Sequence, residues 1–420
     1  MTNLYLKNVR IIDPVSRTDN VSDVIIRDGV IQSPHASTDG LPSYDATGLI
    51  LAPGFWDTHV HFRDPGNPLA ETRQTGARAA AAGGFTHVVT MPNTTPAGDS
   101  IAWLQEQLDD HLPVTIHPSA CISVGRLGRG VSDIEMLAAH GAVAFTDDGS
   151  FVENDDVMRE GMLRARKIGK PLFDHAVVPS IAKEGVIRDC DVATALNLPL
   201  FPVEAEIEAI ARDVRLCGET GCTLVIQHIS TAGGVELIRK ARAEGLPVYA
   251  EASPHHLALA AEDIPGDDGN WRMNPPLGKR EDRAAIRKAV KDGTITLFAT
   301  DHAPHSFETK SKGFLKAPFG VIGLETAIGV TWETMVQEEG MPLMDWVSCW
   351  TIHPAMVLKQ PLQAIVPGEI ADFVLIDPST PWVVNPEKFQ SKSRNCPFAG
   401  QVLHARAVMT ICNGLTTWTI

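Results

Sequence analysis

Two histidines separated by one residue stand at the end of an apolar segment of this chain. Residues 57–63 read DTHVHFR, which places His59 and His61 directly before Arg63. In a β-strand, residues i and i+2 face the same side, so both imidazoles can bind one metal ion. Because two ordinary half-buried histidines can also show this spacing, the pair needs support from elsewhere in the chain.

That support comes from later strand-like segments that end in a residue able to bind a metal. These segments are 142–145 before Asp147 and Asp148, 171–173 before His175, 223–226 before His228, and 296–300 before Asp301. With His59 and His61, they supply a nitrogen and oxygen donor set that suits Zn²⁺ and accepts other divalent ions. The donors exceed what one tetrahedral zinc needs, so the sequence predicts a two-metal site with one bridging carboxylate.

The middle of the chain alternates between strand-like and helix-like segments. The strand candidates are 55–61, 84–90, 113–117, 142–146, 171–175, 223–228, 247–251 and 296–301. The helical candidates include 69–82, 133–140, 155–168, 204–217, 233–244 and 280–291. This pattern predicts an α/β fold, a (β/α)₈ TIM barrel over residues 53–361. The active site of such a barrel lies at the C-terminal ends of its strands, where the candidate ligands fall.

Both ends of the chain contain short β-type runs separated by turn signals such as Asp28-Gly29 and Asn413-Gly414. Neither end is long enough to bury a sheet face comfortably by itself. We therefore predict that residues 1–52 and 362–420 meet to form one small β-sandwich domain beside the barrel.

The charge balance excludes some partners. The chain has 36 basic and 51 acidic residues, a formal net charge of −15. Nucleic acids and anionic membranes attract clustered basic residues, so we predict neither as a partner and expect a small-molecule substrate. The start of the chain lacks a signal-peptide pattern and the seven cysteines are scattered, which favours a cytoplasmic protein.

Strand alternation separates the roles of two adjacent aspartates. Asp148 shares a strand face with the small residues Ala142 and Ala144, whereas Asp147 shares the other face with Phe145. Small residues suit the crowded barrel interior, so we predict that Asp148 is the metal ligand. Asp147 is then either a residue that orients a histidine or a simple turn carboxylate.

Asp301 follows the last predicted barrel strand and opens the segment DHAPH, which ends at His305. A carboxylate at this point can take a proton from an activated water and give it to a leaving nitrogen, as hydrolysis of a C–N bond requires. Elsewhere in a chain, an Asp-His pair would more simply be a helix N-cap.

Arg63 provides a clue to the substrate. A guanidinium just beyond the metal histidines can hold a substrate carboxylate with two hydrogen bonds, whereas a neutral ring would leave the charge unpaired. Asn93 and Asn274 can share that task, although each alone is typical of a turn. His305 and the lysine- and glycine-rich segment 306–320 are predicted to form a mobile loop over the site.

Two adjacent histidines, His255 and His256, are predicted to be structural, because neighbouring residues on a strand face opposite sides. The sequence has no G-x-S-x-G nucleophile motif and no Walker-type phosphate loop.

The chain resembles the bacterial type I dihydroorotases of the amidohydrolase superfamily over nearly its whole length. The motifs that carry the resemblance are Asp57–Gly66, Met91–Thr94, Phe145–Gly149, Arg272–Leu277 and Asp301–His305. Many members of that superfamily bridge their metals with a carboxylated lysine after the fourth strand. This chain has Asp148 there, as do the type I enzymes.

The resemblance implies a reaction and a set of site residues. The reaction is the zinc-dependent, reversible cyclisation of N-carbamoyl-L-aspartate to L-dihydroorotate in pyrimidine (UMP) biosynthesis. The implied zinc ligands are His59, His61, Asp148, His175, His228 and Asp301, with Asp148 bridging two Zn²⁺ ions and Asp301 also acting as catalytic acid and base. The implied substrate contacts are Arg63, Asn93, Asn274, His305, Phe319 and Gly320.

Two other readings stay open at this point. The first is another cyclic-amide hydrolase, such as a dihydropyrimidinase, hydantoinase or allantoinase, whose substrates lack the ring carboxylate that Arg63 would bind. The second is a non-catalytic scaffold for a partner such as aspartate transcarbamoylase, which would have little reason to keep all the ligands. Association with that transcarbamoylase and homo-oligomers remain predictions compatible with an active enzyme.

Overall fold

The computed structural model describes residues 1–108 and 111–420, and its centre is a sheet of eight parallel strands arranged in chain order. The strands are β6 (Phe55–Val60), β7 (Phe85–Thr90), β8 (Thr115–Ala120), β9 (Ala144–Phe145), β10 (Leu172–Asp174), β11 (Leu224–Ile226), β12 (Val248–Ala252) and β13 (Leu297–Phe298). The segment after β13 lies beside β6 and closes the barrel. There the carbonyl of His302 accepts a 2.9 Å hydrogen bond from the amide of His61. The predicted barrel is confirmed.

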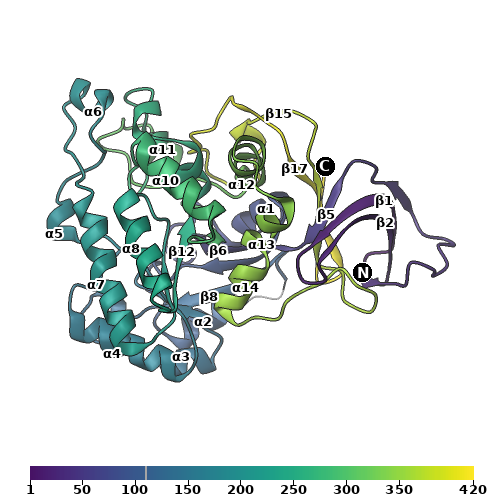
Figure 1. Cartoon of the computed structure of the whole chain (residues 1–420), viewed down its shortest axis with the longest axis horizontal. Coiled ribbons are helices and arrows are strands. Elements are labelled where there is room, and N and C mark those ends of the chain that lie inside the picture. The colour runs from purple at the N-terminus through teal and green to yellow at the C-terminus, as the bar shows by residue number, and fades with distance from the viewer. Residues whose placement is uncertain (109–110) are drawn as a thin grey trace.

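Helices lie between the strands and cover the outside of the barrel (Figure 1). They are α1 (Arg73–Ala82), α2 (Ile101–Gln107), α3 (Ile134–Ala139), α4 (Asp155–Lys167), α5 (Pro179–Ala182), α6 (Asp191–Ala195), α7 (Glu204–Thr220), α8 (Ala232–Ala243), α9 (Pro254–Ala258), α10 (Arg280–Lys291), α11 (Phe307–Lys310), α12 (Ala327–Thr331), α13 (Leu343–Trp350) and α14 (Ile352–Leu358). Helix α1 begins later than predicted because the Thr72 side chain accepts the amide of Thr75 and caps it there.

Aromatic packing fixes the place where the barrel closes. The ring centroid of Phe55 on β6 lies 5.5 Å from that of Trp346, and Trp350 lies 5.2 Å from Phe298 on β13. Trp350 also meets Phe85 on β7 edge to face at 5.3 Å. Because both tryptophans belong to α13, this helix holds the first and last strands of the barrel together through buried aromatic surface.

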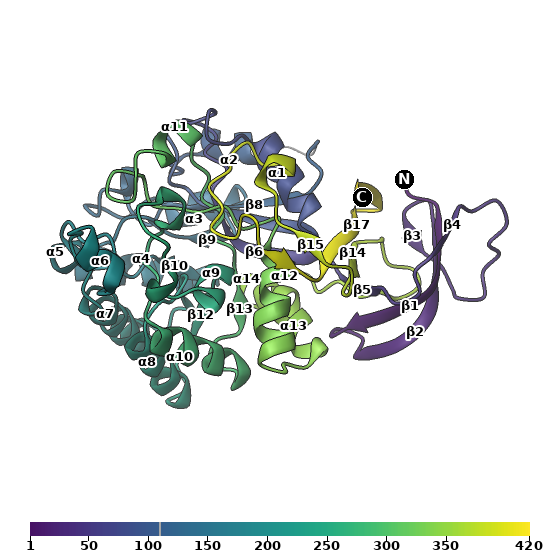
Figure 2. The same ribbon diagram turned by 90° about the horizontal axis from the view of Figure 1, so that it is seen from above.

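The two ends of the chain meet in a second sheet beside the barrel (Figure 2). Its strands are β1 (Leu4–Asp13), β2 (Thr18–Arg27), β3 (Val30–Ile31), β4 (Ser43–Asp45), β5 (Ile50–Pro53), β14 (Phe373–Asp377), β17 (Arg406–Cys412) and β18 (Leu415–Thr419). The pairing of β14 with β5 joins the two ends. The separate terminal β domain is thus confirmed, whereas its limits, 1–52 with 362–420 against 53–361 for the barrel, stay a prediction.

One part of the C-terminal region leaves the terminal sheet and reaches the barrel. Strands β15 (Trp382–Val383) and β16 (Val402–Leu403) pair with each other, and residues 386–398 between them form what we call the strap. The strap contacts the barrel loops through Ser393 Oγ, which donates to the carbonyl of Ala70 at 2.7 Å, and through Asn395 Nδ2, which donates to the carbonyl of Ala303 at 3.0 Å. It therefore ties the terminal region to the loop that follows β13.

Within the described residues, none of the helices has both the length and the apolar character needed to cross a membrane.

Candidate metal centre and substrate cavity

A cavity of about 260 Å³ lies at the C-terminal ends of the barrel strands. Its walls include every predicted site residue except His59, which is fully buried beside them. The sequence prediction thus brings together residues up to 261 positions apart, from His59 to Gly320, at one place in the fold. Their arrangement can be followed from the metal-binding candidates outward.

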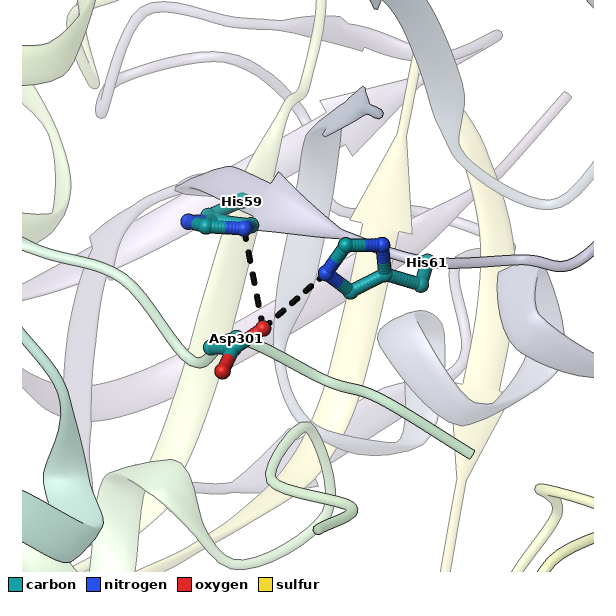
Figure 3. Close-up of side chains that lie close together, drawn as sticks. All are labelled: His59, His61 and Asp301. Carbon is teal, nitrogen blue, oxygen red and sulfur yellow. Dashed lines mark hydrogen bonds and ion pairs between the residues drawn. The ribbon is translucent and has the colours of Figure 1, made fainter. Parts of the chain in front are cut away.

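The first group of donors comes from β6 and from the loop after β13 (Figure 3). Asp301 Oδ1 lies 3.0 Å from His61 Nε2 and 3.6 Å from His59 Nε2. The two histidine rings have centroids 5.1 Å apart, as the i and i+2 spacing predicts. These three side chains therefore direct one donor atom each toward a common point.

Asp148 lies between this group and two more histidines. Its Oδ1 atom is 3.2 Å from His59 Nε2 and 3.9 Å from His175 Nδ1, while its Oδ2 atom is 3.6 Å from His61 Nε2. On the far side, His175 Nδ1 and His228 Nε2 are 2.9 Å apart. A carboxylate that lies within 4 Å of imidazoles from both sets has the position that a bridging ligand needs.

The neighbouring Asp147 points away from this group. Its carboxyl accepts the amides of Ile122 at 2.9 Å and Ser123 at 3.1 Å, and it also accepts the Ser123 hydroxyl. Asp147 and Asp148 thus face different surroundings, as strand alternation predicts, and the role of Asp148 as a metal ligand stays a prediction. Asp147 thus fixes the backbone after β8, a role that differs from both predicted ones, which were to orient a histidine or to serve as a simple turn carboxylate.

Burial and charge set the protonation of these groups. Burial alone would raise the pKa of the Asp148 carboxyl, but His59 and His61 hold it well below its usual range. Burial lowers the pKa of His175, and it lowers that of His228 strongly, so both imidazoles are neutral at neutral pH. Metals bind carboxylates and neutral imidazoles, so these charge states suit a metal site.

The donor set fits divalent metal ions. Two groups, His59 with His61 and Asp301, and His59 with Asp148 and His228, each offer three donor atoms within 4.8 Å of one another, and all of these residues are buried. The nitrogens of His175 and His228 face each other at hydrogen-bond distance. When neither imidazole donates to the other, their lone pairs repel, and a cation between them removes that repulsion. The residues present therefore fit a metal.

Glu251 is a functional candidate that sequence reasoning missed. One of its carboxylate oxygens lies 3.1 Å from His59 Nδ1, and the other accepts the Thr58 hydroxyl at 2.5 Å. A carboxylate on the second nitrogen of a metal-binding histidine fixes the tautomer and the orientation of the ring. The signal in the sequence was a charged residue within the otherwise uncharged strand β12.

Asp57 connects the two strands that carry the first donor group. Its buried carboxyl accepts the amide of His59 at 3.1 Å and the amide of Thr300 at 3.0 Å. Burial raises its pKa to about 7. Because Thr300 precedes Asp301, this contact sets the position of β6 relative to the loop that carries the candidate acid and base.

The two predicted substrate amides also contact candidate ligands. Asn93 Nδ2 donates to Asp148 Oδ2 at 2.9 Å, and its Oδ1 lies 2.9 Å from His61 Nδ1. Asn274 Nδ2 lies 2.9 Å from His175 Nε2. Both amides line the cavity, so they face the substrate space while orienting the metal-binding candidates.

Arg63 and the loop after β13 form a further part of the cavity wall. Arg63 Nε donates to the carbonyl of Pro304 at 3.3 Å, and its Nη2 lies 3.4 Å from His305 Nε2. His305 Nε2 donates in turn to the carbonyl of Phe319 at 2.7 Å. Burial, aided by Arg63, lowers the pKa of His305 to about 3, so this wall carries a neutral imidazole and one guanidinium charge.

His255 and His256 were predicted to be structural because they would lie on a strand, and this reason was wrong. His255 and His256 lie on the short helix α9 rather than on a strand, because Ser253-Pro254 ends β12 and proline starts the helix. The Ser253 hydroxyl lies 2.9 Å from His255 Nε2 and 2.6 Å from His256 Nδ1. His256 Nε2 donates to the carbonyl of Pro275 at 3.1 Å, which supports the segment that carries Asn274.

The match to known proteins extends over nearly the whole chain. Residues 48–233 match the model of a family described as dihydro-orotase-like. A dihydroorotase of Pelotomaculum thermopropionicum is 40% identical over 415 residues, which cover 98% of this chain and 97% of that protein. A dihydroorotase of Syntrophotalea carbinolica is 39% identical over 420 residues, with 99% of each chain covered. This chain belongs to the dihydroorotase family.

Membership of the dihydroorotase family confirms the resemblance carried by the sequence motifs. Solved structures of proteins named hydantoinase or dihydropyrimidinase share the fold of this chain. An L-hydantoinase from Arthrobacter aurescens aligns with a TM-score of 0.85 at 24% identity, covering 99% of this chain and 96% of that one. A dihydropyrimidinase from Brevibacillus agri aligns with a TM-score of 0.85 at 22% identity, covering 99% and 95%. At such low identity these likenesses describe the fold, so the choice of substrate depends on the cavity itself.

Proposed function

We propose that this chain is a dihydroorotase, which converts L-dihydroorotate and water reversibly to N-carbamoyl-L-aspartate in pyrimidine biosynthesis. The observation that carries the proposal is one cavity lined both by Arg63 and by a buried group of imidazoles and carboxylates. Relatives about 40% identical over nearly the full length, themselves named dihydroorotases, support the same activity. Together they favour a small cyclic amide that bears a carboxylate.

The proposed cofactor is a pair of Zn²⁺ ions. His59, His61 and Asp301 would hold one ion, His175 and His228 the other, and Asp148 would bridge them. The distances from Asp148 to His59, His61 and His175, between 3.2 and 3.9 Å, support this assignment, because ligands about 2.1 Å from one metal lie that far apart. When bound, such ions lower the pKa of a water molecule and polarise the substrate carbonyl.

Asp301 is the proposed catalytic acid and base. In the hydrolytic direction, water attacks the ring amide carbon and the C–N bond breaks. One proton of the water passes to the released nitrogen, and the other leaves to solvent as the new carboxylic acid ionises to a carboxylate. Asp301 Oδ2, the oxygen directed away from both histidines in Figure 3, takes the proton of the attacking water and delivers it to the nitrogen. Cyclisation runs through the same steps in reverse.

Arg63 is the proposed anchor for the substrate carboxylate. Its Nε atom is held by the carbonyl of Pro304, so the guanidinium has a fixed direction along the cavity wall. Asn93 and Asn274 also present amides to the cavity, and His305, Phe319 and Gly320 complete its lining. A hydantoin or a dihydrouracil would leave the guanidinium without an anionic partner, which costs binding energy.

The first experiment is turnover of L-dihydroorotate by purified protein of defined metal content, with dihydrouracil, hydantoin and allantoin as comparison substrates. We expect turnover of dihydroorotate alone, loss of turnover after treatment with a chelator, and recovery on addition of zinc. A preference for a neutral ring would overturn the substrate assignment. Full activity in protein without metal would overturn the cofactor assignment.

Arg63→Ala tests the anchor separately from the chemistry. We expect KM for dihydroorotate to rise roughly 10- to 100-fold with a much smaller change in kcat, because a charge-assisted hydrogen bond contributes about 1.5–3 kcal/mol. Arg78→Ala, which removes an exposed guanidinium on α1, is the matched control and should leave KM unchanged. An unaltered KM in Arg63→Ala would show that the carboxylate binds elsewhere.

A cytoplasmic location, a homo-oligomeric state and association with aspartate transcarbamoylase remain part of the proposal. Size-exclusion chromatography with light scattering, alone and with a purified transcarbamoylase, tests the last two.

A further inference from the structure

Lys310 is a buried lysine in the loop that closes one side of the substrate cavity. It ends the short helix α11 and is only 3% exposed. Its Nζ atom donates to the carbonyls of Arg272 at 3.0 Å, Pro318 at 3.0 Å and Gly320 at 2.7 Å. One ammonium group therefore ties together two segments that carry predicted substrate contacts, the one before Asn274 and the one around Gly320.

The strap adds a second tie to the same segments. Asn395 Nδ2 donates to the carbonyls of Ala303 and Gly320, each at 3.0 Å, and its Oδ1 accepts the amide of His305 at 3.3 Å. The carbonyl of Gly320 thus receives hydrogen bonds from both Lys310 and Asn395. We call these two side chains the clasp.

The groups that the clasp holds together are tightly packed. Gly320 has a φ of 130°, and a Cβ atom there would lie 2.8 Å from Ala303 Cβ and 3.0 Å from His305 Nε2. His305 Nε2 is itself bonded to the carbonyl of Phe319. The ring of Phe319 lies 4.1 Å from the Arg272 guanidinium carbon, which completes the contact between the two segments. A small displacement of Gly320 therefore moves the imidazole that faces the substrate.

Burying the amine of Lys310 costs desolvation free energy, and filling space is not a sufficient reason for a lysine at this position. Among the residues that the structure describes, no carboxylate lies within 4 Å of its Nζ atom. Burial, with the nearby Arg272 charge, lowers its pKa to about 7. A methionine would fill similar space without desolvating an amine, so the hydrogen bonds to the three carbonyls are the feature that the lysine adds.

We propose that Lys310, together with Asn395, is a positioning residue that holds His305, Phe319 and Gly320 in the geometry that binds the substrate. The inference rests on the proposed function. The metal-binding candidates and Asp301 lie on or next to the barrel strands, outside the segments that the clasp joins. Loss of the clasp should therefore weaken substrate binding much more than it slows the chemical step.

The test compares Lys310→Met with Lys316→Met, an exposed lysine of the same loop that serves as the matched control. Assays run at pH 6.5, where most of the Lys310 amine is protonated in the wild type. For Lys310→Met we expect KM for L-dihydroorotate to rise at least about tenfold, with kcat within about threefold and metal content unchanged. Lys316→Met should match the wild type in both constants.

Hydrogen–deuterium exchange of the same proteins supplies a readout that needs no turnover. Lys310→Met should exchange faster at residues 303–320 and 269–274, with the barrel strands unchanged. An unaltered KM and unaltered exchange in Lys310→Met would overturn the clasp, and so would equal losses in kcat and in metal content. If the wild type fails to act on dihydroorotate, the proposed function fails, but the exchange measurement still decides whether the clasp exists.

Asn395→Ala removes the hydrogen bonds of the second side chain of the clasp. It should raise KM in the same direction by a smaller factor, because it leaves the three bonds of Lys310 in place. If Lys310→Met does not accumulate as folded protein, this variant decides the question: an increased KM with faster exchange at residues 303–320 supports the clasp, and values equal to the wild type refute it.

Discussion

Two groups of histidines inside the barrel differ in their surroundings. The mouth group, at the C-terminal strand ends, consists of His59, His61, His175 and His228 with Asp148 and Asp301. The floor group, nearer the N-terminal ends of β7 and β8, consists of His87 and His117, whose Nδ1 and Nε2 atoms lie 3.1 Å apart. Both place imidazole nitrogens at hydrogen-bond distance inside one barrel.

Carboxylates and aromatic rings distinguish the two groups. In the mouth group, Asp148 and Asp301 come within 3.0 to 3.9 Å of the imidazoles. In the floor group, His87 and His117 stack on Trp56 with ring centroids 4.1 and 4.6 Å away, and an oxygen of the Asp372 carboxylate lies 3.8 Å from His87 Nε2. Among the described residues, the groups with three donors close enough for a metal lie at the mouth.

Histidine pairs alone therefore do not define a metal site. The floor histidines are held by an indole face and by an amide, since His87 Nε2 lies 3.1 Å from Gln363 Oε1. That environment favours neutral rings that pack, while the carboxylates at the mouth favour a bound cation. Three substitutions test this difference.

Asp301→Asn should have the largest effect, because it removes the proposed acid and base at the mouth. We expect kcat to fall roughly 1,000-fold, since general acid–base catalysis contributes about 10²- to 10⁴-fold. His117→Asn is the matched control at the floor and should leave kcat within about twofold. Metal content must be measured on each sample, because Asp301 is also a candidate ligand. A kcat within tenfold of the wild type would refute its catalytic role.

Glu251→Gln should have a smaller effect, on metal affinity. The carboxylate beside His59 Nδ1 would be replaced by a neutral amide of the same shape, so we expect the metal Kd to rise roughly 10- to 100-fold. Competition with a chromophoric chelator measures this constant without any assay of activity. His117→Asn again serves as control. Equal affinity in Glu251→Gln and the wild type would mean that His59 is oriented by other contacts.

The sequence predicted the mouth group well because its members occupy equivalent positions in repeated units. Each lies at or just after the C-terminal end of a barrel strand, and parallel strands bring these ends to one face. His59, His175 and Asp301 therefore converge although they come from the first, fifth and eighth strands. Alternation along the fourth strand was enough to choose Asp148 over Asp147.

Other features depend on tertiary contacts that no local sequence pattern predicts. Glu251 reaches His59 only because barrel closure leaves β12 one strand away from β6, and the clasp of Lys310 and Asn395 joins segments far apart in the chain. The segment at His255 read as a strand because Pro254 was not recognised as the start of a helix. Each miss comes from tertiary geometry or a helix boundary, whereas periodic strand-end features were predicted correctly.

His117→Asn should have the smallest effect, on the pH dependence of stability. Burial, with His87 and Lys170, lowers the pKa of His117 to about 3, whereas in the unfolded chain it has the ordinary value of 6.5. Between these values the unfolded state binds the proton and the folded state does not, so His117 costs the wild type up to about 1.4 kcal/mol per pH unit as pH falls below 6.5.

Urea denaturation at pH 7 and pH 5, with saturating metal, measures this cost. From pH 7 to pH 5 the wild type should lose roughly 2 kcal/mol more unfolding free energy than His117→Asn, whatever the absolute stabilities are. The same loss in both proteins would show that His117 takes up a proton in the folded state. His117 would then be charged in the folded protein at pH 5, and the contrast between neutral, packed histidines at the floor and cation-binding histidines at the mouth would fail.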